Sequence, residues 1–192
     1  ELVGAHITEP YRIITRFCQG RSLFERLHRS KNKLSPTQLT IIAYEVSVGM
    51  EHLHSVDIVH RDLKTLNILL DDENDCCVAD FGLAGIMKDN QELCGGVGTP
   101  NYTAPEVLSH TRYGPKVDSF SFGVVLWEML LHKIPYENMR AAAIYEFVVT
   151  RGWRLSIPND TPEGLKKLIS RCWSRNPDDR PDFAEIVRLF ES

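Results

Sequence analysis

Apolar and polar side chains alternate near the start of the chain and recur at helical spacing farther along it. Residues 11–17 (YRIITRF) alternate and are rich in β-branched and aromatic side chains, which predicts a strand. Residues 2–7 predict an earlier strand, and the turn at 8–10 joins the two. A short helix is expected over residues 22–27.

The remaining helices follow clear start signals. Residues 36–55 predict a long amphipathic helix, since Ser35 can cap it, Pro36 suits its first position and Gln38 can complete a capping box. The chain is then predicted to be mostly helical after a long irregular stretch. Four later helices are expected, the first of them buried: 118–131, 139–150, 162–173 and 182–191.

The middle of the chain predicts a β-hairpin followed by a loop. Two short apolar runs, 68–70 and 76–79, flank an acidic turn. Cys76 and Cys77 are expected to be small buried residues of the second strand. Residues 80–116 are rich in Gly, Pro and Asn and have no clear period, so they predict a long loop, which usually carries function.

Composition and charge narrow the class of protein. The 192 residues suffice for one domain or for part of a larger one, with 43% hydrophobic and 25% charged residues. The net charge of −4 argues against nucleic acid as the main partner. The five cysteines include no CxxC pair, which fits a reducing, cytoplasmic setting. The longest apolar segment, 120–131, is too short to span a bilayer, so no transmembrane segment is expected.

Polar side chains gather at one end of the predicted hairpin. Asn67 stands directly before its first strand and Asp80 directly after its second, so strand pairing places them side by side. Asp62 lies on the loop that enters the same place. Amide and carboxylate oxygens are ligands that Mg²⁺ prefers, so a magnesium site beside a carboxylate is predicted here.

Three motifs resemble those of eukaryotic protein kinases: HRDLKTLN (60–67) resembles the catalytic loop, DFG (80–82) the metal-binding motif, and APE (104–106) the end of the activation segment. A chance match to HRDxxxxN has a probability on the order of one in a thousand. The resemblance implies an α+β, predominantly helical fold, the large lobe of a kinase. Residues 1–21 would be the last small-lobe strands and hinge, and 22–192 the C-terminal lobe.

The resemblance also implies catalytic roles. Asp62 would orient the substrate hydroxyl and accept its proton, and Lys64 would neutralise charge on the transferred γ-phosphate. Asn67 and Asp80 would hold Mg²⁺, or Mn²⁺ in its place, against the phosphates of ATP. Thr99 would hydrogen-bond to Asp62 and Lys64 and shape the pocket for the substrate hydroxyl.

Further residues are implied in nucleotide binding. Thr15 would be the gatekeeper at the back of the adenine site. The hinge that follows it would bind adenine through backbone groups of Arg16, Phe17 and Cys18. Leu69 would pack beneath the adenine ring. Two residues differ from the family pattern. Arg16 lies in the hinge, where an acidic residue is common, and Arg21 follows the hinge at a position where glycine is common.

The family resemblance also predicts the supporting contacts. Asp118 would accept hydrogen bonds from the backbone of the catalytic loop. Glu106 and Arg180 would form a buried ion pair that ties the long loop to the final helices. His60 would have a structural role, packing under Phe81.

The sequence resembles serine/threonine kinases of the tyrosine-kinase-like group, through Lys64 and the segments GTPNYTAPE, DSFSFGVVLWEML and CWSRNPDDRPDF. The expected activity is ATP-dependent phosphorylation of serine or threonine in a protein substrate, in intracellular signalling. No GxGxxG motif occurs, and only 14 residues precede Thr15. We therefore expect the small lobe and any regulatory domains to lie outside these residues, and this chain alone to have little activity.

Two other functions stay open at this point. The chain could be a pseudokinase or truncated lobe that serves as a binding module, or a metal-dependent hydrolase. The hydrolase leaves Thr99, Glu106, Asp118 and Arg180 unexplained. Residues 86–98 contain no Ser, Thr or Tyr to be phosphorylated, although Arg61 is present to pair with a phosphate. As a hypothesis, Asp89 or Glu92 substitutes for that phosphate, or none is needed.

Overall fold

The computed structural model describes residues 2–87 and 92–192 and confirms the α+β class, with 44% helix and 12% strand in small sheets. Most elements lie close to ranges that the sequence predicts, but the short strands Arg21–Ser22, Ile58–Val59 and Gly85–Ile86 and the short helix Pro105–Leu108 were not predicted. The helices are α1 (Leu23–His28), α2 (Pro36–Ser55), α3 (Pro105–Leu108), α4 (Lys116–Leu131), α5 (Ala141–Tyr145), α6 (Glu163–Cys172) and α7 (Phe183–Glu191). The strands are β1 (Leu2–His6), β2 (Arg12–Thr15), β3 (Arg21–Ser22), β4 (Ile58–Val59), β5 (Ile68–Leu70), β6 (Cys76–Val78) and β7 (Gly85–Ile86).

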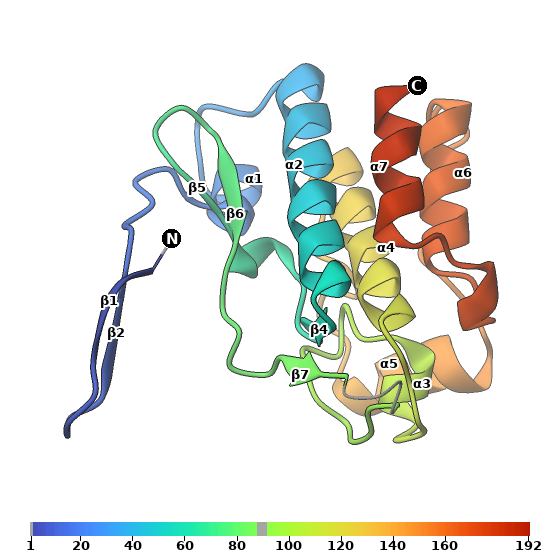
Figure 1. The fold of residues 1–192 in the computed structure, drawn as a ribbon. Coiled ribbons are helices and arrows are strands. Elements are labelled where there is room, and N and C mark those ends of the chain that lie inside the picture. The colour runs from blue at the N-terminus through green and yellow to red at the C-terminus, as the bar shows by residue number, and fades with distance from the viewer. Residues whose placement is uncertain (1, 88–91) are drawn as a thin grey trace.

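The body of the molecule is built around helix α4, which is buried along most of its length. Helix α2 lies against α7, and α4 lies against α6 (Figure 1). Gly123 allows the close approach of α4 and α6, because a Cβ atom at this position would lie 2.7 Å from the Cβ of Cys172. None of the helices in the described ranges has the length and apolar character that crossing a bilayer requires.

Helix α2 begins where the sequence predicts, and its cap is complete. The Gln38 backbone N–H donates to Ser35 Oγ at 3.2 Å, and the Ser35 backbone N–H donates to Gln38 Oε1 at 2.9 Å. Both hydrogen bonds satisfy backbone donors that the first turn of a helix leaves without partners. The predicted capping box is therefore confirmed.

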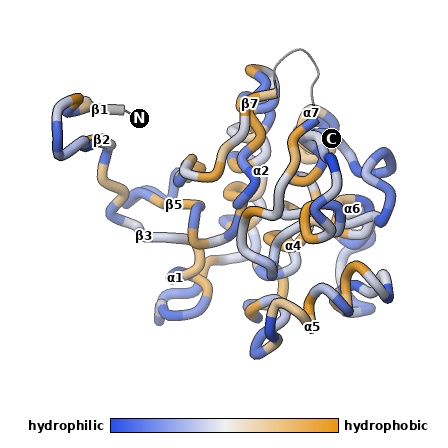
Figure 2. The backbone as a smooth tube through the Cα atoms, turned by 90° about the horizontal axis from the view of Figure 1, so that it is seen from below, coloured by the Kyte–Doolittle hydropathy of each residue, from blue (hydrophilic) through white to orange (hydrophobic). Residues whose placement is uncertain are grey.

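The β1–β2 hairpin stands apart from the helical body in both views (Figures 1 and 2). Every residue of β2 is exposed, and so are large apolar side chains on both sides of the turn, among them Val3, Tyr11 and Ile13. Residues 16–20 connect this hairpin to β3, which joins β5 and β6 in the small sheet of the body.

The β5–β6 hairpin has the predicted position but not the predicted burial. Ile68 pairs with Val78, Leu69 with Cys77 and Leu70 with Cys76. Cys76 is half-buried and Cys77 is exposed, so the expectation that both are buried is wrong. The physical reason is the alternation of side chains along a strand, which puts Cys77 on the same open face as Leu69.

Residues 80–116 contain more structure than the sequence predicts. Strand β7 pairs with β4, and α3 forms a short helix with Pro105 in its first turn. Leu93 and Tyr113 exchange two backbone hydrogen bonds of 2.9 Å. These elements are too short to produce a period, so the expectation of a structureless loop is wrong. The predicted helix over 139–150 also differs, because it is α-helical only in α5 and continues as a π-helical turn over Glu146–Thr150.

Candidate active site

The first turn of α4 supports the loop between β4 and β5 through hydrogen bonds. The carboxylate of Asp118 is fully buried and accepts hydrogen bonds from the backbone N–H groups of His60 at 2.8 Å and Arg61 at 2.9 Å. His54 Nε2 lies 2.9 Å from the same carboxylate. Arg61 has a φ of 67°, a conformation that is strained for a residue with a side chain. The three partners of Asp118 thus fix the path of the loop.

Asp62 lies at the centre of a hydrogen-bonded cluster and is only 7% exposed. The backbone N–H and the hydroxyl of Thr99 donate to Asp62 Oδ1 at 2.9 and 2.8 Å. Lys64 Nζ lies 2.7 Å from Asp62 Oδ2 and 2.8 Å from Thr99 Oγ1. The Thr99 hydroxyl donates once and accepts once, so its single proton satisfies both contacts. Two segments that are 37 positions apart in the sequence therefore meet at one carboxylate.

Asn67 is oriented by the same aspartate. Its Nδ2 donates to the backbone oxygen of Asp62 at 2.9 Å and to Asp62 Oδ2 at 3.3 Å. Both partners can only accept, so the amide nitrogen must face them. The amide oxygen, Oδ1, has no hydrogen-bond partner among the described residues and can accept one from a ligand.

Asp80 stands one position beyond the last paired residue of the hairpin. The Ala79 N–H donates to the backbone oxygen of Asn67 at 2.8 Å, which extends the β5–β6 ladder by one hydrogen bond. Asp80 itself is exposed and has a φ of 65°. Its Oδ1 accepts a hydrogen bond of 3.3 Å from the Gly82 N–H. Asn67 and Asp80 thus lie at the same end of the strand pair.

These two residues are a chemically suitable pair for Mg²⁺. The amide oxygen of Asn67 and the exposed carboxylate of Asp80 are hard oxygen donors, and two protein donors leave room for water and phosphate oxygens. No group of three or more His, Cys, Asp or Glu side chains in the described residues forms a metal cluster. A cation here would therefore depend on the oxygens of a bound phosphate compound as well as on the protein.

The aromatic residue after Asp80 contacts the loop as the family resemblance implies. The rings of His60 and Phe81 have centroids 5.4 Å apart, and His60 is fully buried. His60 Nε2 lies 3.0 Å from the backbone oxygen of Ala79, so this ring links the loop to the end of β6. His60 Nδ1 also accepts a hydrogen bond of 3.2 Å from the Asp62 backbone N–H, so all three ring contacts are made to the protein and the position of the ring is structural.

The predicted nucleotide residues are only partly brought together. Leu69 is half-buried in β5, and Cys18 Sγ lies 3.6 Å from Cys77 Sγ on the facing strand β6. Arg16 Nη2 lies 3.5 Å from Asp71 Oδ2. Thr15 and Phe17 are exposed on the β1–β2 side. Of the residues that the structure describes, none joins either side chain to the catalytic loop by a hydrogen bond.

Arg21 is the first residue of β3, directly after the connector of residues 16–20, and has an unusual backbone conformation. Its φ is 67°, and it lines a hollow of about 170 Å³ together with Arg26, Arg29 and Glu25. Positive φ is a conformation that glycine adopts without strain and that is unusual for arginine. Arg21 also adds positive charge beside the connector.

Arg61 does not pair with an acidic side chain in the described residues. Its guanidinium instead donates to two backbone oxygens and one phenol, those of Leu83, Ala84 and Tyr113. Glu92 is exposed and forms no ion pair within the described ranges, so the hypothesis that it takes the place of a phosphate gains no support. Asp89 lies outside the described residues.

A buried glutamate on α4 supports the site and was not predicted from the sequence. Glu128 accepts hydrogen bonds from the hydroxyl groups of Thr65 at 3.0 Å and Tyr102 at 2.7 Å, and His28 Nε2 lies 2.7 Å away. Burial raises the pKa of Glu128, and these three hydrogen bonds oppose that shift. The available signal was a charged residue inside the apolar segment 120–131. The network joins α1, the loop before β5 and the loop before α3.

The segment before α3 is anchored to the C-terminal part of the chain. Arg180 Nη1 and Nη2 lie 2.6 and 2.9 Å from the two carboxylate oxygens of Glu106. The Arg180 side chain is fully buried and that of Glu106 is 14% exposed. The guanidinium also lies over the ring of Phe120, 5.2 Å from its centroid. The predicted buried ion pair is thus present and bidentate.

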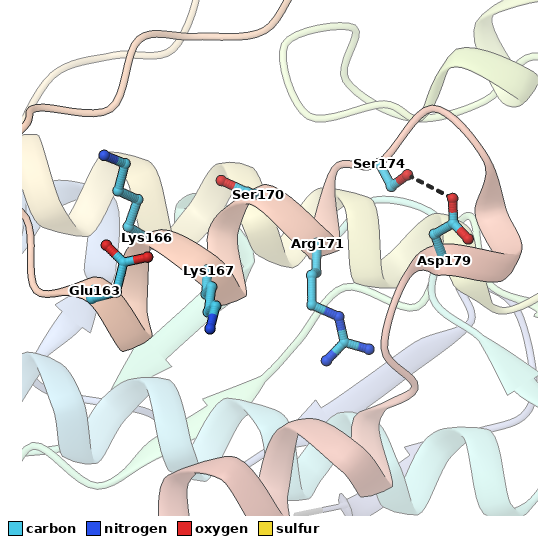
Figure 3. Close-up of a pocket in the computed structure, with 7 residues that line it drawn as sticks. All are labelled: Glu163, Lys166, Lys167, Ser170, Arg171, Ser174 and Asp179. Atoms are coloured by element: carbon cyan, nitrogen blue, oxygen red, sulfur yellow. Dashed lines mark hydrogen bonds between the residues drawn. The ribbon is translucent and has the colours of Figure 1, made fainter.

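Two hollows lie away from these residues. The first has a volume of about 320 Å³, sits along α6 and is lined by charged and polar side chains (Figure 3). The second, of about 480 Å³, is apolar and lies among α2, α4, α6 and α7. Neither includes a residue of the catalytic loop, so neither is the candidate active site.

The fold and the cluster around Asp62 define a lobe of the protein kinase type. The sequence profile described as "Protein tyrosine and serine/threonine kinase" matches residues 1–190. The chain therefore belongs to the protein tyrosine and serine/threonine kinase family. The expected likeness to the tyrosine-kinase-like group is also confirmed, because the chain's relatives are serine/threonine and dual-specificity kinases of that group.

Individual relatives cover nearly the whole chain. It is 40% identical over 190 residues to the dual specificity protein kinase pyk3 of Dictyostelium discoideum, which covers 99% of the chain and 14% of that protein. It is 38% identical over 192 residues to the serine/threonine-protein kinase STY46 of Arabidopsis thaliana, covering 100% and 33%. The serine/threonine-protein kinase TNNI3K of Mus musculus is 37% identical over 198 residues, covering 100% and 24%. The chain thus spans about a third or less of these relatives.

Proposed function

We propose that this chain carries the catalytic machinery of an ATP-dependent protein kinase that phosphorylates serine or threonine. One observation supports this most strongly: both oxygens of Asp62 are held, one by Thr99 and the other by Lys64. These contacts hold the carboxylate of Asp62 in one orientation. Family membership agrees with the proposal, since relatives include named serine/threonine kinases.

Asp62 would orient the hydroxyl of the acceptor residue and take its proton as phosphate is transferred. Lys64 Nζ, 2.7 Å from Asp62 Oδ2, carries the positive charge that would stabilise the negative charge developing on the phosphate. Thr99 lies beside both and would bound the space for a small acceptor hydroxyl. The protein thus contributes positioning and electrostatic stabilisation.

The metal would be Mg²⁺, with Mn²⁺ as a substitute, held by Asn67 and Asp80. When bound, the cation supplies charge neutralisation to the phosphates of ATP. Asn67 is suited to this role because Asp62 engages its amide nitrogen and leaves the oxygen available. Asp80 is suited because it is exposed at the end of the same hairpin.

The adenine ring of ATP would bind to backbone groups of the hinge residues Arg16, Phe17 and Cys18 and would pack over Leu69. Thr15 would act as the gatekeeper at the back of this site.

The substrate would be a protein with a serine or threonine acceptor, phosphorylated in cytoplasmic signalling. Five free cysteines support a reducing compartment. The sequence has no GxGxxG motif, so we expect the 192-residue chain alone to transfer phosphate slowly. A non-catalytic binding module is the alternative that the experiment below separates from an enzyme.

Transfer of radiolabelled phosphate from ATP tests the proposal, with the full-length protein and a peptide mixture of serine, threonine and tyrosine acceptors. Asp62→Asn is expected to lower the rate about 100-fold or more, because the proton acceptor is lost. Asp160→Asn, the same change at an exposed position, should leave the rate unchanged. Label that appears only on tyrosine contradicts serine/threonine specificity. A wild-type protein without transfer would favour the binding module.

A further inference from the structure

Two thiols from distant parts of the chain meet beside the small sheet. Cys18 Sγ and Cys77 Sγ lie 3.6 Å apart, although 59 positions separate them in the sequence. Cys18 belongs to the connector 16–20, and Cys77 is the middle residue of β6. Cys77 is exposed and Cys18 is half-buried, so solvent and small molecules can reach the pair.

The other cysteines have different surroundings. Cys76 points toward α2, where its Sγ lies 3.7 Å from the backbone oxygen of Ile42. Cys172 is fully buried between α4 and α6. Cys94 is exposed on the segment after β7. Within residues 2–87 and 92–192, the contact of Cys18 with Cys77 is the only one between two sulfur atoms.

We propose that Cys18 and Cys77 are a covalent modification site that a small oxidant, such as hydrogen peroxide, converts to a reversible disulfide. The thiolate of one cysteine attacks a peroxide oxygen, expels hydroxide and becomes a sulfenic acid. The second thiol then attacks that sulfur, and the S–O bond breaks to release water. In sum, two thiols and one peroxide give one disulfide and two water molecules, each sulfur losing one electron.

The local geometry permits this reaction. The two sulfur atoms must approach from 3.6 Å to the bond length of about 2.05 Å. The connector can make this movement, because residues 16–20 form no regular helix or strand. Cys77 is fixed by comparison, since β6 is paired with β5 along its whole length. We therefore expect the connector to move toward the sheet.

The thiol chemistry sets the pH dependence. Cys77 is exposed as a whole residue, but partial burial of its thiol, followed by the hydrogen bond with Cys18, raises the pKa of Cys77 to about 11. The reactive form of a cysteine is the thiolate, so Cys77 reacts slowly at neutral pH. Formation of the disulfide should accelerate as the pH is raised from 7 toward 9.

Peptide mapping by mass spectrometry tests the site on the reduced 192-residue chain, treated with hydrogen peroxide and digested without reductant. The expected product is a peptide containing Cys18 linked to the peptide containing Cys76 and Cys77, lost on treatment with dithiothreitol. Cys18→Ser and Cys77→Ser should abolish the link. Cys76→Ser is the matched control, because its side chain faces α2, and it should keep the link.

Thermal unfolding supplies a second readout. A disulfide across 59 positions restricts the unfolded chain, so oxidation should raise the midpoint by roughly 5–15 °C in the wild type and the Cys76→Ser variant only. All reduced variants should unfold at similar temperatures, which excludes misfolding as the cause. A link that survives Cys77→Ser, or oxidation to separate sulfinic acids with no link, would overturn the proposal.

Discussion

The ion pair between Glu106 and Arg180 tests how burial affects the free energy that is lost when an ion pair is broken. Glu106→Gln removes one charge and preserves the shape of the side chain. Arg180 cannot turn to solvent in response, because its side chain is fully buried. Its Nε donates to the backbone oxygen of Ser174 at 3.0 Å, and its Nη1 donates to that of Lys116 at 3.1 Å. The guanidinium therefore stays in place without its carboxylate.

The expected cost follows from that unpaired charge. Arginine cannot lose its proton in a protein, so the charge persists after the substitution. Breaking a buried ion pair by removing one partner costs about 3–5 kcal/mol. Glu106 retains 14% exposure, which admits some water and favours the lower part of this range, about 3–4 kcal/mol. For a chain of 192 residues this corresponds to a lower unfolding midpoint by roughly 6–16 °C.

Urea denaturation followed by tryptophan fluorescence measures the free energy of unfolding. Glu185→Gln is the matched control, because Arg171 and Glu185 also lie 2.6 Å apart but their side chains are 44% and 36% exposed. The control should lose less than about 1 kcal/mol. Equal losses in the two variants would refute the reasoning, because burial would then not distinguish the two ion pairs.

Two further predictions concern α4. Glu128→Ala should lower the free energy of unfolding by about 3 kcal/mol or more, since buried donors, including the Tyr102 hydroxyl, lose their acceptor; urea denaturation measures this. Burial and the nearby charges of Lys33 and His28 lower the pKa of His132. The folded state therefore binds a proton at His132 less readily than the unfolded state does. As a result, the free energy of unfolding has its full value above pH 6.5 and decreases as the pH falls below it. His132→Asn, which tolerates the φ of 51° at this position, should reduce the fall in unfolding midpoint between pH 8 and pH 5.

Each of these predictions has a contrary outcome. A loss below about 1 kcal/mol for Glu128→Ala would mean that the three donors find other partners, against the geometry of the network. Parallel pH profiles for the wild type and His132→Asn would mean that protonation of this histidine is equally easy in the folded and unfolded states. Thermal scans at matched ionic strength separate these cases.

Local signals explain which helices could be predicted from the sequence. The start of α2 follows from Ser35 and Gln38, whose two hydrogen bonds involve neighbours only three positions apart. The buried helix α4 follows from its apolar composition, although it starts at Lys116 instead of 118. Elements that depend on distant partners were missed, such as the pairing of Leu93 with Tyr113.

The residues of the candidate site also divide into those with a local sequence motif and those whose role depends on distant partners. The residues of the catalytic loop, DFG and APE motifs carry their own sequence signature, so they could be named before any geometry was available. Glu128 carries no motif, and its role depends on hydroxyl groups 63 and 26 positions away in Thr65 and Tyr102. The exposure of Cys77 was missed because an apolar run does not reveal which face of a strand is covered.

Binding of Mn²⁺ in the presence of an ATP analogue, followed by electron paramagnetic resonance, tests the central claim most directly. The claim is that the β5–β6 hairpin brings Asn67 and Asp80 together to hold the cation of a nucleotide. Asp80→Asn in the full-length protein should abolish nucleotide-dependent Mn²⁺ binding, whereas Asp72→Asn, an exposed position in the turn of the same hairpin, should retain it. Equal Mn²⁺ binding by the two variants would contradict the account.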